Sequence, residues 1–261
     1  MSSLVVDIDS KVYGNGTCAI SGLHITAKQG EFVAIVGPSG TGKTTLLNII
    51  AGIDKQFIGN MKFGESNTNK NISFMFQDSR LLPWLSVQSN IEIVLDRHDR
   101  NSVEKQSRIA ELLQKVGLEG IAKSYPNQLS GGMKRRVSMV RAFVNQPQLL
   151  LMDEPFQSLD APTAFELRTM LLELWQETKC TVILVTHSLR EALTMADRVV
   201  FLSNCPANVI LDYDIELPRP RQLEDNTVTL LHTNLLMQYP QILSGSLFSD
   251  SLLDKETEQS E

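Results

Sequence analysis

The stretch GPSGTGKTT, residues 37–45, constrains this chain more than any other part of its sequence. It follows the apolar run EFVAIVG (31–37), which is typical of a buried strand, and it opens a helical pattern over 43–52. Glycines within it allow the backbone to curl with its N–H groups pointing inward, and the helix N-terminus adds a positive dipole there. A strand, this loop and a helix in that order predict a phosphate-binding loop, and they disfavour a glycine-rich turn without a ligand.

The side chains of this loop complete its chemistry. Lys43 is expected to reach the β- and γ-phosphates of a nucleotide, and the Thr44 hydroxyl is expected to ligate Mg²⁺. The predicted nucleotide-binding residues of the loop are Gly37, Pro38, Ser39, Gly40, Thr41, Gly42, Lys43, Thr44 and Thr45.

A second signal is LLLMDEP (149–155), an apolar run that ends in two carboxylates. A buried strand would place them at its carboxyl end, where ligands of parallel α/β sheets bind. Taken alone, the acidic pair could equally be a solvated turn. Beside a phosphate-binding loop, Asp153 is predicted to hold Mg²⁺, and Glu154 to orient and polarise the water that attacks the γ-phosphate.

Short apolar runs alternate with helical patterns along the chain, which favours a parallel α/β sheet. Asn101 and Glu104 resemble a capping box that opens a helix over 101–117, and SLRE (188–191) resembles another. The last residues, SLLDKETEQSE, are predicted to be frayed. The further predicted strands are 71–76, 148–153, 181–186 and 198–203.

Composition excludes several classes of protein. No apolar stretch reaches the length of a membrane span, and the N-terminus lacks a signal-peptide pattern, so we expect a cytosolic chain of 261 residues. Its three cysteines are expected to be free thiols. The net charge is -6, made up of -7 on residues 211–261 and +1 on residues 1–210, so neither part has the basic character of a nucleic-acid-binding protein.

Together, the motifs resemble those of the ATP-binding-cassette ATPases over residues 4–215. The resemblance rests on GPSGTGKTT, FMFQD, LSGGM, LLLMDEP, SLD and VTHS, in the family's order and spacing. It implies a P-loop NTPase α/β fold with a RecA-like, mostly parallel core sheet, an N-terminal antiparallel β subdomain and an inserted α-helical signature subdomain near 86–145. The ATPase domain would span 1–215, followed by an acidic C-terminal extension, 216–261.

The same resemblance assigns further roles, with ATP and Mg²⁺ as the bound groups. In this family the serine and glycines of LSGG contact the γ-phosphate of an ATP held by the opposite subunit. Physically, that segment could instead be a helix cap with a flexible glycine pair. The resemblance implies that Gln77 contacts Mg²⁺ and water and that His187 lies at the γ-phosphate. It also implies that Asp160 crosses the dimer interface and that Tyr13 stacks on adenine. The signature residues are Ser130, Gly131 and Gly132. Alternatively, Tyr13 and His187 are packing residues without a ligand.

The sequence departs from the family pattern at Arg135, where glutamine is usual, and in QSLD, where relatives tend to have GALD. Arg135 would add a cation near a phosphate site. LLPW after the Q-loop (the segment around Gln77) and a phenylalanine after LLLMDEP resemble importers of nitrate, sulfonates, taurine, bicarbonate and pyrimidine precursors. The apolar residues 81–85 predict a docking groove for a partner helix or, alternatively, packing within their own subdomain.

We therefore expect the ATP-hydrolysing subunit of such an importer. It would act as a homodimer beneath two membrane subunits served by a solute-binding protein, peripheral to the cytoplasmic face of the plasma membrane and without nucleic acid. The alternatives are a non-hydrolysing regulatory cassette and a soluble cassette ATPase without a transporter.

Overall fold

The structure is a computed structural model that describes residues 2–64, 71–95 and 102–247. The chain divides into two compact units. The first comprises Met1–Lys28, Phe32–Phe63 and Leu184–Glu261, and the second comprises Gln29–Glu31 and Gly64–Ile183. In the described part of the chain, no helix is both long enough and apolar enough to cross a membrane.

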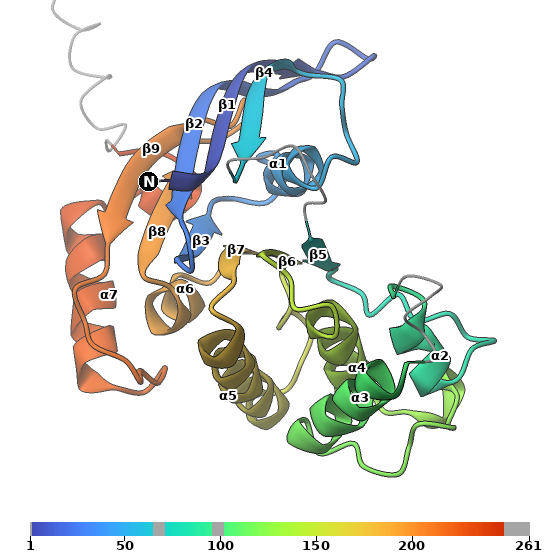
Figure 1. The fold of residues 1–261 in the computed structure, drawn as a ribbon. Coiled ribbons are helices and arrows are strands. Elements are labelled where there is room, and N and C mark those ends of the chain that lie inside the picture. The colour runs from blue at the N-terminus through green and yellow to red at the C-terminus, as the bar shows by residue number, and fades with distance from the viewer. Residues whose placement is uncertain (1, 65–70, 96–101, 248–261) are drawn as a thin grey trace, which may run out of the picture. The chain divides into compact units, whose positions relative to one another are not determined.

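The elements of the first unit are labelled in Figure 1. They are β1 (Ser2–Val12), β2 (Cys18–Lys28), β3 (Phe32–Val36), α1 (Lys43–Ile50), β4 (Ile58–Phe63), α6 (Leu189–Met195), β8 (Arg198–Leu202), β9 (Val209–Asp214), α7 (Asn226–Gln238) and a 3₁₀ turn at Ile242–Ser244.

The second unit contains most of the helices. Its elements are β5 (Ile72–Met75), α2 (Val87–Glu92), α3 (Val103–Lys115), a 3₁₀ turn at Pro126–Gln128, α4 (Gly131–Phe143), β6 (Leu149–Asp153) and α5 (Ala161–Thr178). Strand β7 (Thr181–Thr186) begins in this unit and ends in the first.

An antiparallel sheet with the strand order β2-β1-β4 forms one layer of the first unit (Figure 1). Its central strand pairs Val6 with Ile25 on one side and with Met61 on the other. Leu4, Val6 and Ile8 are buried, so alternate residues of β1 face the core. This is the antiparallel β region that the family resemblance implies near the N-terminus.

Strand β3, which leads to the phosphate-binding loop, lies in a second sheet with β8 and β9. Strand β3 is buried over its whole length and runs parallel to β8, with Val36 opposite Phe201. Strand β9 continues this sheet antiparallel to β8. A strand that is buried throughout reads as a continuous apolar run, which is why EFVAIVG was recognisable in the sequence.

The segment after β9 is attached to the C-terminal end of α6. Arg221 donates to the carbonyls of Leu193 (2.7 Å) and Ala196 (2.5 Å), and Arg219 donates to the carbonyl of Met195 (2.6 Å). Burial, with a contribution from Arg219, lowers the pKa of Arg221 to about 10. Cations at a helix C-terminus satisfy its last carbonyls and its negative dipole end. The described part of the predicted acidic extension therefore supports the helix that follows His187.

In the second unit, β5 and β6 are parallel and in register, with Met75 opposite Met152. Helix α4 packs against α2, α3, α5 and β5, so it is the central helix of this unit. Parallel pairs in both units agree with the predicted sheet, and β9 is the antiparallel addition.

Two predicted helix starts differ in detail. Helix α3 is capped by Ser102, whose hydroxyl accepts from Lys105 N (3.2 Å), whereas Asn101 lies outside the described residues.

At α6, the Ser188 hydroxyl accepts from Glu191 N, as expected for a cap. The Ser188 N–H, however, donates to the Thr186 hydroxyl (3.0 Å), which donates to the Glu191 carboxylate (2.8 Å). A hydroxyl thus mediates the contact that a capping box makes directly. Residues 251–261, predicted to be frayed, lie outside the described residues.

Candidate nucleotide-binding site

The phosphate-binding loop of the first unit connects the buried strand β3 to helix α1. Gly40 has φ 79° and Gly42 has φ 101°, both in the left-handed region that glycine tolerates best. A Cβ at Gly42 would lie 2.9 Å from the carbonyl oxygen of Ala19 in β2. Gly42 is therefore required by its conformation and by the close approach of β2. The loop ends at the N-terminus of α1, which favours an anion there.

Lys43 lies inside this loop. Its side chain is buried, and Nζ donates to the carbonyls of Gly37 (2.9 Å) and Pro38 (2.6 Å). The Thr41 hydroxyl donates to the Pro38 carbonyl (3.1 Å). These bonds hold the positive charge of Lys43 against the backbone of the loop. Thr44 is exposed at the first turn of α1, as a residue that meets a ligand must be.

Tyr13 is attached to the same helix. Its hydroxyl is hydrogen-bonded to the Thr45 hydroxyl (2.7 Å), and 42% of its surface is exposed. The ammonium of Lys11 lies 4.9 Å from its ring centroid and is also bonded to Asp54 (2.9 Å). The structure thus brings Tyr13 to the phosphate-binding loop across 32 residues of sequence. Its stacking on adenine stays a prediction, with Lys11 already near one ring face.

His187 is the other predicted site residue of the first unit outside the loop. It follows β7 directly and is exposed, and α6 begins two residues later. Exposure at the carboxyl end of a buried strand suits a ligand contact better than core packing.

In the second unit, Asp153 is the last residue of β6, and Gln77 follows the neighbouring parallel strand β5. Because Met75 and Met152 are opposite each other, the ends of β5 and β6 bring the Q-loop beside Asp153. Asp153 is 8% exposed, and Glu154 is half-buried. Glu154 has φ 44°, a conformation that is costly for a side chain with a Cβ and that clusters at functional sites.

The signature segment begins helix α4 as a conventional capped helix. The Ser130 hydroxyl accepts from Met133 N (3.2 Å), and Ser130 and Gly131 are exposed. A Cβ at Gly131 would meet nothing within 4 Å, whereas one at Gly132 would lie 2.9 Å from Thr163 Cγ2. Gly132 therefore allows α4 to pack against α5, a purpose that the sequence did not reveal. Gly131 leaves the helix end open.

Asp160 is next to this contact because it caps α5. Its carboxylate accepts from Thr163 N (3.0 Å) and from the Thr163 hydroxyl (2.8 Å). These two bonds lower the pKa of Asp160, the backbone N–H more than the hydroxyl. The structure therefore brings the signature and Asp160 together on adjacent helices of one chain. Contact of Asp160 with a second subunit stays a prediction.

The sequence suggested that Arg135 adds a cation near a phosphate site, but the structure directs its side chain elsewhere. Its side chain is buried and donates to the carbonyl of Phe76 in the Q-loop (3.1 Å). Burial lowers its pKa, against the opposing effect of nearby Asp78. The added cation therefore anchors the Q-loop instead of lying at the exposed N-terminus of α4. Helical spacing explains this, because Arg135 shares a face of α4 with the buried residues Ser138, Met139 and Ala142, three, four and seven positions later.

Other residues that hold the Q-loop and the loop after it had no sequence motif to reveal them. Arg141 donates to the carbonyls of Ser79 (2.7 Å) and Arg80 (2.9 Å). Asn90 is fully buried, accepts from Leu82 N (2.7 Å) and donates to three carbonyls between residues 82 and 86. A polar residue inside an apolar helical pattern was the available signal, because a buried amide must be bonded.

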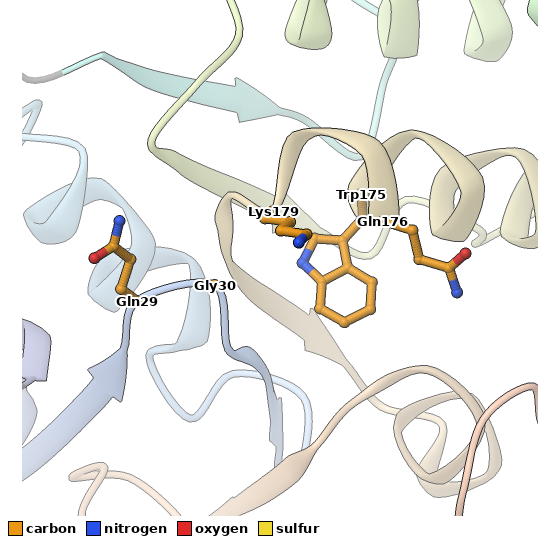
Figure 2. Close-up of a pocket in the computed structure, with 5 residues that line it drawn as sticks. All are labelled: Gln29, Gly30, Trp175, Gln176 and Lys179. Atoms are coloured by element: carbon orange, nitrogen blue, oxygen red, sulfur yellow. The ribbon is translucent and has the colours of Figure 1, made fainter.

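A surface cavity of about 470 Å³ lies elsewhere in the second unit, lined by Gln29, Gly30, Trp175, Gln176 and Lys179 (Figure 2). The Trp175 indole donates to the Cys180 carbonyl (2.9 Å), so it is held as part of the wall. None of the predicted site residues lines this cavity.

The predicted metal ligands fit Mg²⁺ by their chemistry. Thr44, Gln77 and Asp153 offer hydroxyl, amide and carboxylate oxygens, which are the donors that Mg²⁺ prefers. Among the described residues, no group of three or more His, Cys, Asp or Glu side chains could hold a metal ion.

Comparison with known proteins decides the family. The family described as ABC transporter matches residues 20–157. An aliphatic sulfonates import ATP-binding protein of Burkholderia lata, SsuB 2, is 38% identical over 238 residues, which cover 90% of this chain and 85% of that protein. The chain belongs to the ABC transporter family. The predicted family and ATPase activity are confirmed: this protein is an ATP-binding-cassette ATPase.

Further comparisons agree with this family and with the fold. The SsuB of Rhodopseudomonas palustris is 41% identical over 230 residues, covering 88% of this cassette and 79% of that protein. A solved dimeric, post-hydrolysis state of the ATP-binding cassette MJ0796, bound to ADP and Pi, superposes with a TM-score of 0.68 at 30% identity, covering 82% of this chain and 100% of that one. The predicted P-loop NTPase fold class is therefore confirmed.

Substitution of Gly42 tests whether the loop conformation serves nucleotide binding. We expect Gly42→Ala to weaken ATP binding by at least about tenfold, because the loop must shift away from Ala19 to admit a Cβ and its N–H groups shift with it. Gly52→Ala is the matched control, since Gly52 has φ 71° but open space and lies beyond the other end of α1. Isothermal titration with ATP measures both. Equal affinities in the two variants would contradict the requirement at Gly42.

Proposed function

We propose that this cassette is the ATP-hydrolysing subunit of an importer for aliphatic sulfonates or related small anions. The observation that carries the proposal is a phosphate-binding loop with a buried, pre-positioned Lys43, in a chain 36–42% identical to proteins named as aliphatic sulfonates import ATP-binding proteins. Neither a non-hydrolysing regulatory cassette nor a soluble ATPase is favoured by these relatives.

The residues divide the work of ATP hydrolysis between them. The loop N–H groups, Lys43 and the N-terminus of α1 bind the phosphates, and Thr44, Asp153 and Gln77 hold Mg²⁺. Mg²⁺ held by these residues would supply positive charge to offset the negative charge that develops on the phosphate oxygens. Glu154 orients and polarises the attacking water, and His187 contacts the γ-phosphate. Glu154 follows the last residue of β6, and its left-handed backbone conformation sets the direction in which its side chain projects from the end of this strand.

Each site is completed by a second copy of the chain. Ser130 and Gly131 are exposed at the N-terminus of α4, where an anion is favoured and a Cβ at Gly131 would meet no neighbour. This helix end would close over the γ-phosphate of an ATP held by the partner subunit, and Asp160, on the adjacent helix, would lie at the same interface. The solved MJ0796 cassette, which is dimeric and bound to ADP and Pi, supports the pairing of two copies.

The loop that contains Trp84 is proposed to dock a cytoplasmic segment of the membrane subunit. The 69% exposure of Trp84 supports docking over packing within its own subdomain, and its neighbours Leu81, Leu82 and Leu85 in the sequence LLPWL are half-buried. Asn90 fixes the backbone of this loop, which presents the indole in a defined position. The complex would lie at the cytoplasmic face of the membrane and receive its solute from a solute-binding protein.

Glu154→Gln is the direct test of hydrolysis coupled to import. We expect the purified variant to hydrolyse ATP at least ~10²-fold more slowly, because the amide keeps the size of the side chain but cannot polarise water as a carboxylate does. ATP binding should persist. Cells that carry the variant should lose uptake of a labelled aliphatic sulfonate, which cells with the unchanged chain retain.

The outcomes separate the parts of the proposal. Normal hydrolysis by Glu154→Gln would assign the base to another residue, and loss of ATP binding would show damage to the fold. Hydrolysis by the unchanged chain without any sulfonate uptake would overturn the sulfonate assignment and leave the ATPase in place.

Mixed dimers test the composite site. Lys43→Ala and Ser130→Arg homodimers should both be nearly inactive, because each spoils both of its sites. A mixed dimer has one site with both changes and one site with neither, so ATP hydrolysis should partly return when the two proteins exchange subunits. Phosphate release is measured after tagged subunits confirm the exchange. No recovery in confirmed mixed dimers would contradict a site shared in this way.

Trp84→Ala tests the docking loop. We expect weaker assembly with the membrane subunits, by about 2 kcal/mol if Trp84 is a central anchor, and an unchanged affinity for ATP. The matched control is Val103→Ala, because Val103 is also an exposed apolar residue of the second unit, at 83%. Copurification and thermal unfolding are measured for both. Early melting of the isolated Trp84→Ala subunit, with normal assembly, would show that the indole serves the core.

A further inference from the structure

The backbone of the Q-loop is held from one side by helix α4. Arg135 donates to the Phe76 carbonyl (3.1 Å), and Arg141 donates to the carbonyls of Ser79 and Arg80 (2.7 and 2.9 Å). These bonds bracket Gln77 on both sides along the chain. The position of its Cα is therefore fixed, and what remains to be set is the orientation of its exposed side-chain amide.

The Gln77 side chain is met by one from the turn after Asp153. Gln77 Nε2 donates to Gln157 Oε1, across 80 residues of sequence. Gln157 lies in a short turn between Glu154 and Ser158, which have φ 44° and 63°, and its own N–H donates to the Glu154 carbonyl (3.2 Å). The half-buried Gln157 is thus held by the same turn that positions Glu154.

A glutamine amide has two chemically different ends. Its oxygen ligates Mg²⁺ and accepts hydrogen bonds from water, whereas its NH₂ group only donates and cannot ligate the metal. When Gln157 accepts from the NH₂ group, the oxygen at the other end of the planar amide is directed away from Gln157. An amide without this partner can turn through 180° at little cost and present the wrong end.

We propose that Gln157 is a positioning residue that orients the Gln77 amide so that its oxygen, and not its nitrogen, faces Mg²⁺ and the attacking water. The inference rests on the proposed function, because it takes Gln77 as a ligand in ATP hydrolysis. It also links the orientation of Gln77 to the turn that carries Glu154, so the metal ligand and the base are set by one segment.

Three substitutions separate orientation from packing. Gln157→Glu keeps only acceptors and preserves the bond from Gln77 Nε2. Gln157→Met has a similar length but cannot accept. Gln157→Lys can only donate, so it would bind the Gln77 oxygen and turn the amide around.

The measurement is Mn²⁺ or Mg²⁺ affinity for the protein saturated with a non-hydrolysable ATP analogue, by electron paramagnetic resonance or calorimetry. We expect Gln157→Met to weaken metal binding by about two- to tenfold, as the loss of one orienting hydrogen bond predicts. Gln157→Lys should weaken it further, and Gln157→Glu should bind the metal at least as tightly as the unchanged chain. Affinity for the analogue without metal should stay the same, and thermal unfolding confirms that each variant folds.

Repeating the series with Gln77→Glu removes the effect of added charge. A carboxylate has an oxygen at both ends, so its orientation does not matter, whereas the positive charge that Gln157→Lys introduces acts on the metal in either background. We therefore expect Gln157→Met to have no effect there and Gln157→Lys to cost less than it does beside Gln77. Unchanged metal affinity in Gln157→Met beside Gln77, or an equal cost of Gln157→Lys in both backgrounds, would overturn the inference.

Gln77→Ala distinguishes this inference from the proposed function. If Gln77→Ala weakens metal binding but the Gln157 variants behave as the unchanged chain, the inference is wrong and the role of Gln77 stands. If Gln77→Ala has no effect, both the inference and the metal-binding role of Gln77 are wrong. Failure of the unchanged chain to bind or hydrolyse ATP would refute the proposed function itself.

Discussion

The site depends on a single constraint: buried parallel strands must end in turns that expose polar groups. Strands β3 and β6 are buried along their whole length, so nothing polar can project until each strand ends. The first residues beyond β3 form the phosphate-binding loop, and the last residue of β6 is Asp153. Gln77 and His187 follow β5 and β7 in the same way. Apolar burial therefore determines where along the chain the chemistry can occur.

The Q-loop and the loop that follows it receive hydrogen bonds from several elements of the second unit. Helix α4 supplies Arg135 and Arg141 to its carbonyls, the turn after β6 supplies Gln157 to its side chain, and Asn90 fixes the loop that follows it. The same helix α4 begins at the signature serine. A displacement of α4 would therefore move both the Q-loop and the exposed helix end, because Arg135 and Arg141 of α4 hold Q-loop carbonyls and the same helix begins after Ser130.

The departures from the family pattern have local physical explanations. Arg135 is compatible with its site because its guanidinium faces a backbone carbonyl instead of a phosphate, and Asp78 partly offsets the cost of burying its charge. In QSLD, Gln157 binds Gln77, Ser158 adopts a left-handed conformation with φ 63°, and Asp160 caps α5. The QSLD segment, which departs from the family pattern, therefore makes specific hydrogen bonds in this structure.

The sequence by itself determined the family, the α/β class and the positions of the phosphate-binding loop, Asp153 and Glu154, because these follow from local patterns: a buried run, a glycine spacing and a carboxylate at a strand end. Only the tertiary structure decided which way Arg135 points, why Gly132 must be small, that Tyr13 reaches Thr45 and that Gln157 meets Gln77. Each of these depends on contacts between segments far apart in the chain or between packed helices. No local spacing encodes them, since a side chain's partner is set by how the elements that carry both residues pack.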